Sequence, residues 1–128
     1  MPICLALAQT LVAVLPTNAF TLVWIHSVEK TEWREEWRVE GSRLRLAEAA
    51  VRGSGAGMEP PTDAAFVDGE WRYQPGVPPM HRLALANSEF GGRYRLCWSG
   101  SCRPLASLLP PGAIGAVELY PCQREGQC

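Results

Sequence analysis

Apolar and polar residues alternate along residues 20–51, and this is the clearest pattern in the chain. A strand with one buried face shows a period of two, because successive side chains point to opposite sides of a sheet. The pattern predicts three consecutive strands, with the sequences TLVWIHSV, WREEWRV and RLRLAEAAV. We expect these strands to pair as one antiparallel sheet.

Gly41 and Ser42 separate the second and third of these strands. A glycine at the first central position is what a type II′ hairpin turn requires, and a two-residue turn fixes the strand register. The predicted pairs on the inward face are Val39 with Leu44, Trp37 with Leu46, Glu35 with Glu48, and Trp33 with Ala50.

The link between the first and second strands, around Lys30 and Thr31, has weaker turn chemistry. A loop closed by Val28 and Trp33 keeps the inward faces of both strands in phase. The resulting predicted pairs are Leu22 with Val39, Trp24 with Trp37, and His26 with Glu35.

Together the two hairpins predict a row of His26, Glu35 and Glu48 across three adjacent strands. Trp24 and Trp37 are expected on one side of the row, and Val28 and Trp33 on the other. Cβ atoms of directly opposed residues lie about 5 Å apart, so at least one pKa in the row should shift. One interpretation is a ligand-binding site. Another is a divalent-metal site or an acid–base catalyst. A third is a polar pair that only fixes the register.

The segment RGSGAGMEPPTD follows the third strand and has glycine at every second position of its first half. Alternating glycines permit positive φ and let backbone amides line a concavity that suits an anion. The lysine and hydroxyl of a Walker loop are missing. We expect Gly55, Gly57, Met58 and Glu59 to line the same cavity as Glu48, unless the segment is only a crossing loop between sheets.

Further strands are predicted on both sides of this region. At the N-terminus they span residues 3–7 and 10–15, with a turn near Ala8 and Gln9. In the second half they are GEWRYQP, HRLALA, GRYRLCW and AIGAVELY, and RPLASLLPPG predicts a helical turn before Pro110. The predicted fold is an all-β domain over residues 1–128: a small antiparallel β-sandwich or partly open barrel of about eight to nine short strands.

The chain contains five cysteines, an odd number that leaves at least one thiol unpaired within a monomer. A hairpin through Ser99 and Gly100 would place Cys97 opposite Cys102, within disulfide reach. Pairing of the terminal strands would bring Cys4 near Cys122, although the sequence does not decide whether they pair. The predicted disulfide candidates are therefore Cys97, Cys102, Cys4 and Cys122.

The composition narrows the function classes. The 128 residues fit one domain, and a hydrophobic fraction of 47% provides enough apolar surface for one core, while 20% charged residues favour a soluble chain. The formal net charge of -1 provides no positive surface for nucleic acid. The apolar N-terminal run is too short to span a bilayer and lacks the basic start of a signal peptide, which predicts a cytoplasmic location, with the periplasm as the alternative.

The runs FTLVWIHSVEKTEWREEWRV and GSGAGMEPP, with CWSGSC and the terminal YPC, resemble an uncharacterised bacterial domain-of-unknown-function family. Genes of that family often lie beside, or are fused with, TAXI-type TRAP transporters for organic solutes, and some members resemble exported or membrane-tethered proteins. The resemblance implies an accessory role in solute uptake and carries no established reaction. The matching positions are His26, Ser27, Glu29, Glu35, Gly55, Gly57, Met58 and Glu59.

No complete set of nucleophile, base and cofactor motif is present in the sequence, and Ser27 should point away from the face of His26. We therefore expect a non-enzymatic accessory or ligand-binding module without a cofactor. Its expected partners are TRAP transporter subunits or a small organic anion. The alternatives are a metal-binding protein or metal-dependent enzyme that uses His26, Glu35 and Glu48, and a structural partner-docking protein.

Overall fold

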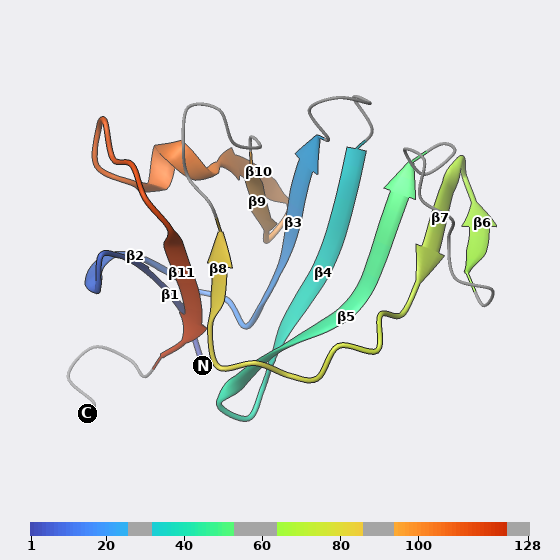
Figure 1. The fold of residues 1–128 in the computed structure, drawn as a ribbon, viewed down its shortest axis with the longest axis horizontal. Coiled ribbons are helices and arrows are strands. Elements are labelled where there is room, and N and C mark those ends of the chain that lie inside the picture. Colours follow the sequence, from blue (N-terminus) through green and yellow to red (C-terminus); the bar gives the residue numbers. More distant parts are fainter. Residues whose placement is uncertain (26–31, 53–63, 86–93, 123–128) are drawn as a thin grey trace.

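The computed structural model describes residues 1–25, 32–52, 64–85 and 94–122, which form two antiparallel sheets (Figure 1). The sheet of four strands has the order β2-β1-β11-β8, and the sheet of seven has the order β10-β9-β3-β4-β5-β7-β6. The elements are β1 (Ile3–Leu7), β2 (Thr10–Leu15), β3 (Ala19–Ile25), β4 (Glu32–Glu40), β5 (Arg43–Arg52), β6 (Ala65–Val67), β7 (Glu70–Tyr73), β8 (Leu83–Leu85), β9 (Arg95–Trp98), β10 (Ser101–Pro104), the 3-10 helix η1 (Leu105–Leu108) and β11 (Val117–Pro121).

The smaller sheet brings the two ends of the chain together. Strands β1 and β2 have the predicted bounds, and Ala8 and Gln9 make the turn between them with positive φ. Strand β11 pairs with β1 on its other side. Cys4 and Cys122 form a disulfide with a Cα–Cα distance of 5.7 Å, so the terminal strands are also linked covalently.

The larger sheet is built on the β3–β4–β5 meander (Figure 1). Gly41 adopts positive φ and Ser42 does not, as expected for the first and second central residues of a type II′ turn. Val39 then lies opposite Leu44, and Trp37 lies opposite Leu46, which confirms the first two predicted pairs. Downstream of β7, the chain passes from the larger sheet to the smaller one, and an isolated bridge between Leu44 and Met80 holds the crossing.

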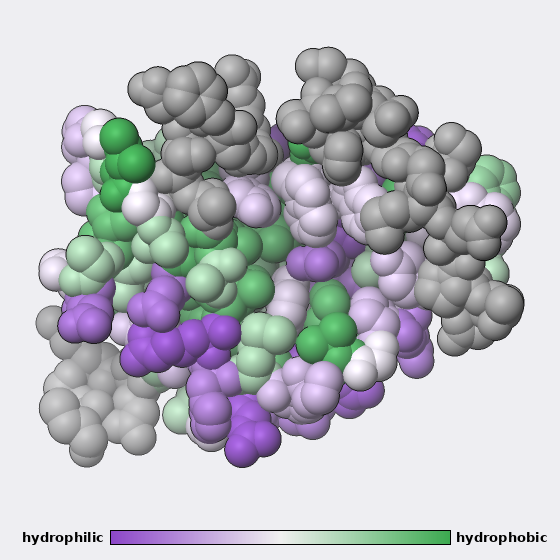
Figure 2. Space-filling view, viewed as in Figure 1, coloured by the Kyte–Doolittle hydropathy of each residue, from purple (hydrophilic) through white to green (hydrophobic). Residues whose placement is uncertain are grey.

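The core lies between the two sheets and takes side chains from both. On the face seen in Figure 2, apolar side chains gather on the side where β1, β11 and β8 lie, and strongly hydrophilic ones lie along the lower edge. Each fully buried large apolar side chain stabilises the fold by about 1.5–3 kcal/mol. The core residues with no exposed surface are Ile3, Leu5, Leu44, Leu96, Val117 and Leu119.

The all-β sandwich predicted from the sequence is confirmed, and the two sheets do not close into a barrel. The described residues form eleven strands, more than predicted, because β6 and β10 are short edge strands that complete hairpins with β7 and β9. The predicted helical turn is present as η1. The predicted disulfide between Cys97 and Cys102 is present as well. No helix in the described part of the chain is long and apolar enough to cross a membrane.

The predicted register between β3 and β4 is wrong by several residues. Leu22 lies opposite Glu35 and Trp24 lies opposite Trp33, whereas the sequence predicted Val39 and Trp37 as their partners. The described pairs run from Ala19 with Arg38 to Ile25 with Glu32, four residues out of step with the prediction, and the predicted pair of His26 with Glu35 is excluded because Glu35 pairs with Leu22. The observed register stacks two aromatic pairs, Trp24 on Trp33 and Phe20 on Trp37, whereas the predicted register paired only Trp24 with Trp37.

The predicted pair of Glu35 with Glu48 is also wrong, because a β-bulge interrupts the β4–β5 ladder between Glu36 and Trp37. Leu46 pairs with Trp37 and Glu48 pairs with Glu36, so Ala47 is the extra residue on β5. One inserted residue exchanges the two faces of a strand for every residue beyond it. Glu48 therefore shares the outer face with Glu36, and Glu35 lies opposite Ala49 on the inner face.

Candidate functional site

Aromatic side chains form a row across the inner face of the larger sheet, at the end where β3 finishes and β4 begins. The strand registers line up Trp24, Trp33, Val51, Trp71 and Phe66 across β3, β4, β5, β7 and β6. Tyr94, directly before β9, extends the row on the other side because its ring contacts Trp24. We call Tyr94, Trp24, Trp33, Trp71 and Phe66 the aromatic row.

The rings of the aromatic row contact one another in two groups. Trp24 and Trp33 are stacked, with ring centroids 5.8 Å apart and planes 11° apart, and the Tyr94 centroid lies 6.1 Å from that of Trp24. Phe66 and Trp71 meet edge to face at 5.0 Å. Trp24, Trp33 and Tyr94 are only partly buried, so their rings are not fully used in core packing.

Glu35 lies on the same face of β4 as Trp33, two residues further along the strand. Leu22 and Ala49 are its cross-strand neighbours, and its Oε1 accepts a hydrogen bond of 3.0 Å from Trp37 Nε1. Burial raises the pKa of the Glu35 carboxyl, and the Trp37 hydrogen bond offsets only part of this effect. None of the ion pairs among the described residues includes Glu35.

Two tyrosines lie within the electrostatic reach of Glu35. Burial, and then the negative charge of Glu35, raise the pKa of both Tyr73 and Tyr94. Trp33 adds an unused donor, since its Nε1 is buried and has no hydrogen-bond partner in the described ranges. A buried N–H without a partner costs free energy.

A second carboxyl in the sheet shows what a purely structural site in this chain looks like. Glu70 on β7 is 3% exposed and accepts hydrogen bonds from Arg34 (2.5 and 3.0 Å) and Arg72 (2.8 Å) on the outer face. The hydrogen bond from Arg34, followed by that from Arg72, lowers the pKa of Glu70 despite its burial. This carboxylate is fully compensated, whereas Glu35 is not.

The structure brings together only part of the predicted site. Trp24, Glu35 and Trp37 share the inner face, as predicted. Glu48 does not belong with them, because the bulge at Ala47 turns it to the outer face. The remaining predicted site residues, His26, Gly55, Gly57, Met58 and Glu59, lie outside the described residues.

The alternative prediction of a metal site made of His26, Glu35 and Glu48 is wrong, because Glu35 and Glu48 lie on opposite faces of the sheet and cannot bind one ion. Within the ranges that the structure covers, no group of three His, Cys, Asp or Glu side chains is placed to hold a metal ion. The chemistry that these residues do support is recognition: an ionisable carboxyl beside π faces, a tryptophan N–H donor and two phenols.

The site residues predicted from the sequence did not include Trp33, Tyr73 or Tyr94. The sequence did place Trp33 on the inward face beside Glu35, which the structure confirms, but its predicted partner Ala50 is wrong because the bulge makes Val51 the partner. Tyr73 and Tyr94 lie far along the chain, and only long-range contacts reveal their position. Tyr73 pairs with Ala49 across β5 and β7, and Tyr94, directly before β9, contacts the ring of Trp24.

Residues 20–105 match the model of a protein family described as Domain of unknown function (DUF1850). The chain belongs to the DUF1850 family. The part that matches the DUF1850 model includes strands β3 to β10 and therefore the aromatic row and Glu35. No curated protein and no solved structure shows significant similarity to the chain.

Glu35→Gln should stabilise the folded chain at neutral pH. The variant keeps an oxygen for the Trp37 N–H but removes a charge that burial disfavours. Because the folded pKa of Glu35 lies above its unfolded value, the wild type loses stability as pH rises past about 4.3, the usual value for glutamate. We expect the variant to exceed the wild type in free energy of unfolding at pH 7, and the difference to shrink below pH 4, in urea denaturation.

Glu70→Gln is the control with the opposite sign, because the folded pKa of Glu70 is lowered. Its stabilisation is present above the unfolded pKa and is lost as pH falls. The variant should lose about 1–3 kcal/mol at pH 7, since the two arginines that it leaves are partly exposed. A Glu35→Gln variant that is less stable than the wild type at pH 7 would show that Glu35 is a compensated structural carboxylate.

Proposed function

We propose that this chain is a non-enzymatic binding module whose inner face receives a small organic ligand that carries an ammonium group. The observation that carries the proposal is Glu35, a partly buried carboxyl beside aromatic rings that has no cationic partner in the described part of the chain. A ligand cation would supply that partner. Ligand binding also agrees with the wider prediction from the sequence, although the set of residues differs.

The aromatic row favours a cation over a neutral apolar ligand. A cation within about 6 Å of an indole or phenol ring gains about 0.5–2 kcal/mol from the ring quadrupole. Trp24, Trp33 and Tyr94 offer such rings next to Glu35, and all three are partly exposed. The Trp33 N–H could also donate to an acceptor on the same ligand. An amino acid or a related zwitterion combines both groups.

The organic anion expected from the sequence requires a different protonation state. A ligand carboxylate would be repelled by ionised Glu35 and attracted only when Glu35 is protonated and donates a hydrogen bond. The raised pKa of Glu35 moves that form toward neutral pH. The two ligand classes therefore have opposite pH dependence: cation affinity rises as pH rises through the pKa of Glu35, and anion affinity falls.

Calorimetric titration with two sets of probes tests the proposal. The cation set is tetramethylammonium and zwitterionic amino acids, and the anion set is succinate and related dicarboxylates. We expect binding from the cation set, stronger at pH 7 than at pH 4, with affinity reduced at least about tenfold in Glu35→Gln, the loss of one charge-assisted contact. Glu48→Gln, which removes a carboxylate from the outer face of the same sheet, should bind like the wild type.

Three results would contradict this assignment in different ways. Binding of dicarboxylates that weakens as pH rises would assign the site to an organic anion. Equal loss of affinity in Glu35→Gln and Glu48→Gln would mean a nonspecific charge effect. No binding from either set would leave the inner face as a surface for a protein partner.

A second candidate function is an accessory role in TRAP-type organic solute uptake, through contact with TRAP transporter subunits. Three of the sequence motifs that resemble the TRAP-associated family, FTLVWIHSVEKTEWREEWRV, GSGAGMEPP and CWSGSC, lie within residues 20–105, the region that the DUF1850 model matches, and the terminal YPC lies outside it. The two disulfides, Cys4–Cys122 and Cys97–Cys102, support a site of action in an oxidising compartment. That support favours the periplasmic alternative over the cytoplasmic location predicted from the N-terminus.

Co-purification tests the accessory role directly. The tagged chain, produced together with the subunits of a TRAP transporter, should retain a transporter subunit through a salt wash, and mass spectrometry should identify it. The matched control is Trp24→Ala, which removes one ring of the stacked pair on the inner face. Retention of the same subunit by an unrelated tagged β-domain, or of no subunit at all, would count against the accessory role.

A further inference from the structure

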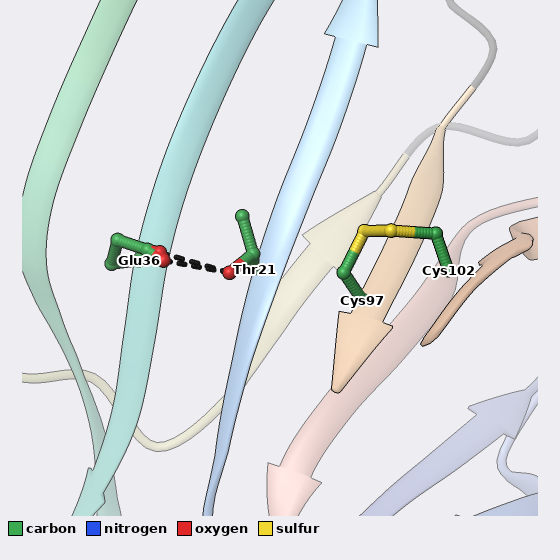
Figure 3. Close-up of a disulfide and its surroundings, with 4 residues drawn as sticks. All are labelled: Thr21, Glu36, Cys97 and Cys102. Atoms are coloured by element: carbon green, nitrogen blue, oxygen red, sulfur yellow. Dashed lines mark hydrogen bonds between the residues drawn. A yellow bond between two sulfur atoms is a disulfide. The ribbon is translucent and has the colours of Figure 1, made fainter. Parts of the chain in front are cut away.

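The Cys97–Cys102 disulfide lies on the outer face of the β9–β10 hairpin, away from the core (Figure 3). Cys102 is exposed and Cys97 is partly exposed. On the neighbouring strand β3, Thr21 lies opposite Cys97, and its hydroxyl donates to the Glu36 carboxylate at 2.6 and 2.8 Å. The disulfide thus continues a polar row on the solvent side of the sheet.

The hairpin does not need this bond to hold its shape. Ser99 and Gly100 both adopt positive φ in the two-residue turn, and Ser101 pairs with Trp98 beside it. Leu96, which has no exposed surface, packs into the core opposite Leu22. Backbone pairing and apolar burial therefore fix β9 in the sheet whether or not the sulfurs are joined.

The two disulfides of the chain differ in how much each can stabilise the fold. Cys4 and Cys122 are separated by 118 residues in sequence, whereas Cys97 and Cys102 are separated by 5. A disulfide stabilises chiefly by restricting the unfolded chain, and the restriction grows with the length of the closed loop. The short loop gives the Cys97–Cys102 bond the smaller structural effect, although it is the more accessible of the two.

An incoming group can also reach this bond. A hollow of about 530 Å³ opens on the outer face beside it, and both cysteines line it together with Trp98 and Ser99. Thr21 and Glu36, on the neighbouring strands β3 and β4, also line it. Thiol–disulfide exchange requires access of a thiolate to one sulfur along the bond that will break, and exposed disulfides are the labile ones in proteins.

We propose that Cys97–Cys102 is a thiol–disulfide exchange site that reacts with a dithiol while the rest of the fold stays intact. A thiolate of the dithiol attacks the Sγ of Cys102, the more exposed of the two residues, the bond between the two Sγ atoms breaks, and Cys97 leaves as a thiolate that takes up a proton. The second thiol of the dithiol then attacks the mixed disulfide and releases Cys102 as a thiol. The dithiol is oxidised to a disulfide, and the cysteine pair gains two electrons and two protons.

Timed alkylation under native conditions tests this proposal. The protein is the full chain with Cys128→Ser, because Cys128 lies outside the described residues and takes part in neither disulfide. After addition of dithiothreitol, aliquots are alkylated and each cysteine is quantified by mass spectrometry, with circular dichroism recorded in parallel. We expect Cys97 and Cys102 to become alkylated at least about tenfold faster than Cys4 and Cys122, with the β-sheet signal unchanged.

Cys97→Ser/Cys102→Ser in the same background is the second test. It should fold, with a denaturation midpoint close to that of the parent, whereas Cys4→Ser/Cys122→Ser should lower the midpoint clearly. The proposal is overturned if both disulfides open at the same rate, if Cys97 and Cys102 react only as the β-sheet signal is lost, or if the chain without this pair fails to fold.

Discussion

The stacking of Trp24 on Trp33 is the interaction on which the rest of the sheet depends. It sets the register between β3 and β4, and the same register places Phe20 beside Trp37, with parallel rings 6.5 Å apart. Aromatic pairs across strands add about 0.5–1.5 kcal/mol beyond their burial. With two such pairs in phase, any shift of one residue would turn the tryptophans of one strand toward solvent. Glu35 is then fixed between them, on the inner face.

The bulge at Ala47 completes this arrangement, because it separates the two carboxyls that an uninterrupted ladder would bring together. Glu48 joins the polar outer face, and Glu35 keeps only the Trp37 N–H as a described hydrogen-bond partner. Glu70 shows that the chain supplies arginines where a buried carboxylate is needed for structure alone. The uncompensated Glu35 is therefore the side chain that most needs a partner from outside, which connects the fold to the proposed ligand.

Much of the fold could be predicted from alternation, turn residues and cysteine spacing. The N-terminal hairpin, the Gly41 turn and the Cys97–Cys102 disulfide follow from short-range chemistry, and each was predicted. The Cys4–Cys122 disulfide joins residues separated by 118 positions, and the sequence left that pairing open. The site depended on the register of β4 against β3 and β5, and the prediction of both registers failed for physical reasons. In the sequence Ala47-Glu48-Ala49-Ala50 the contrast between polar and apolar positions is weak, so a one-residue bulge leaves no trace in the pattern. Between Trp24 and Trp33 the sequence contains no residue pair typical of a tight turn, so the alternation alone did not fix the β3–β4 register.

The most direct measurement of the central claim is a titration of the Glu35 side-chain carboxyl by carbon-13 NMR, with Glu70 in the same spectra as an internal reference. Burial without a cationic partner predicts a Glu35 midpoint above about 4.3, the ordinary glutamate value, and a Glu70 midpoint below it. A Glu35 midpoint at or below that value would mean that its charge is already solvated or paired within the protein, and would contradict the account.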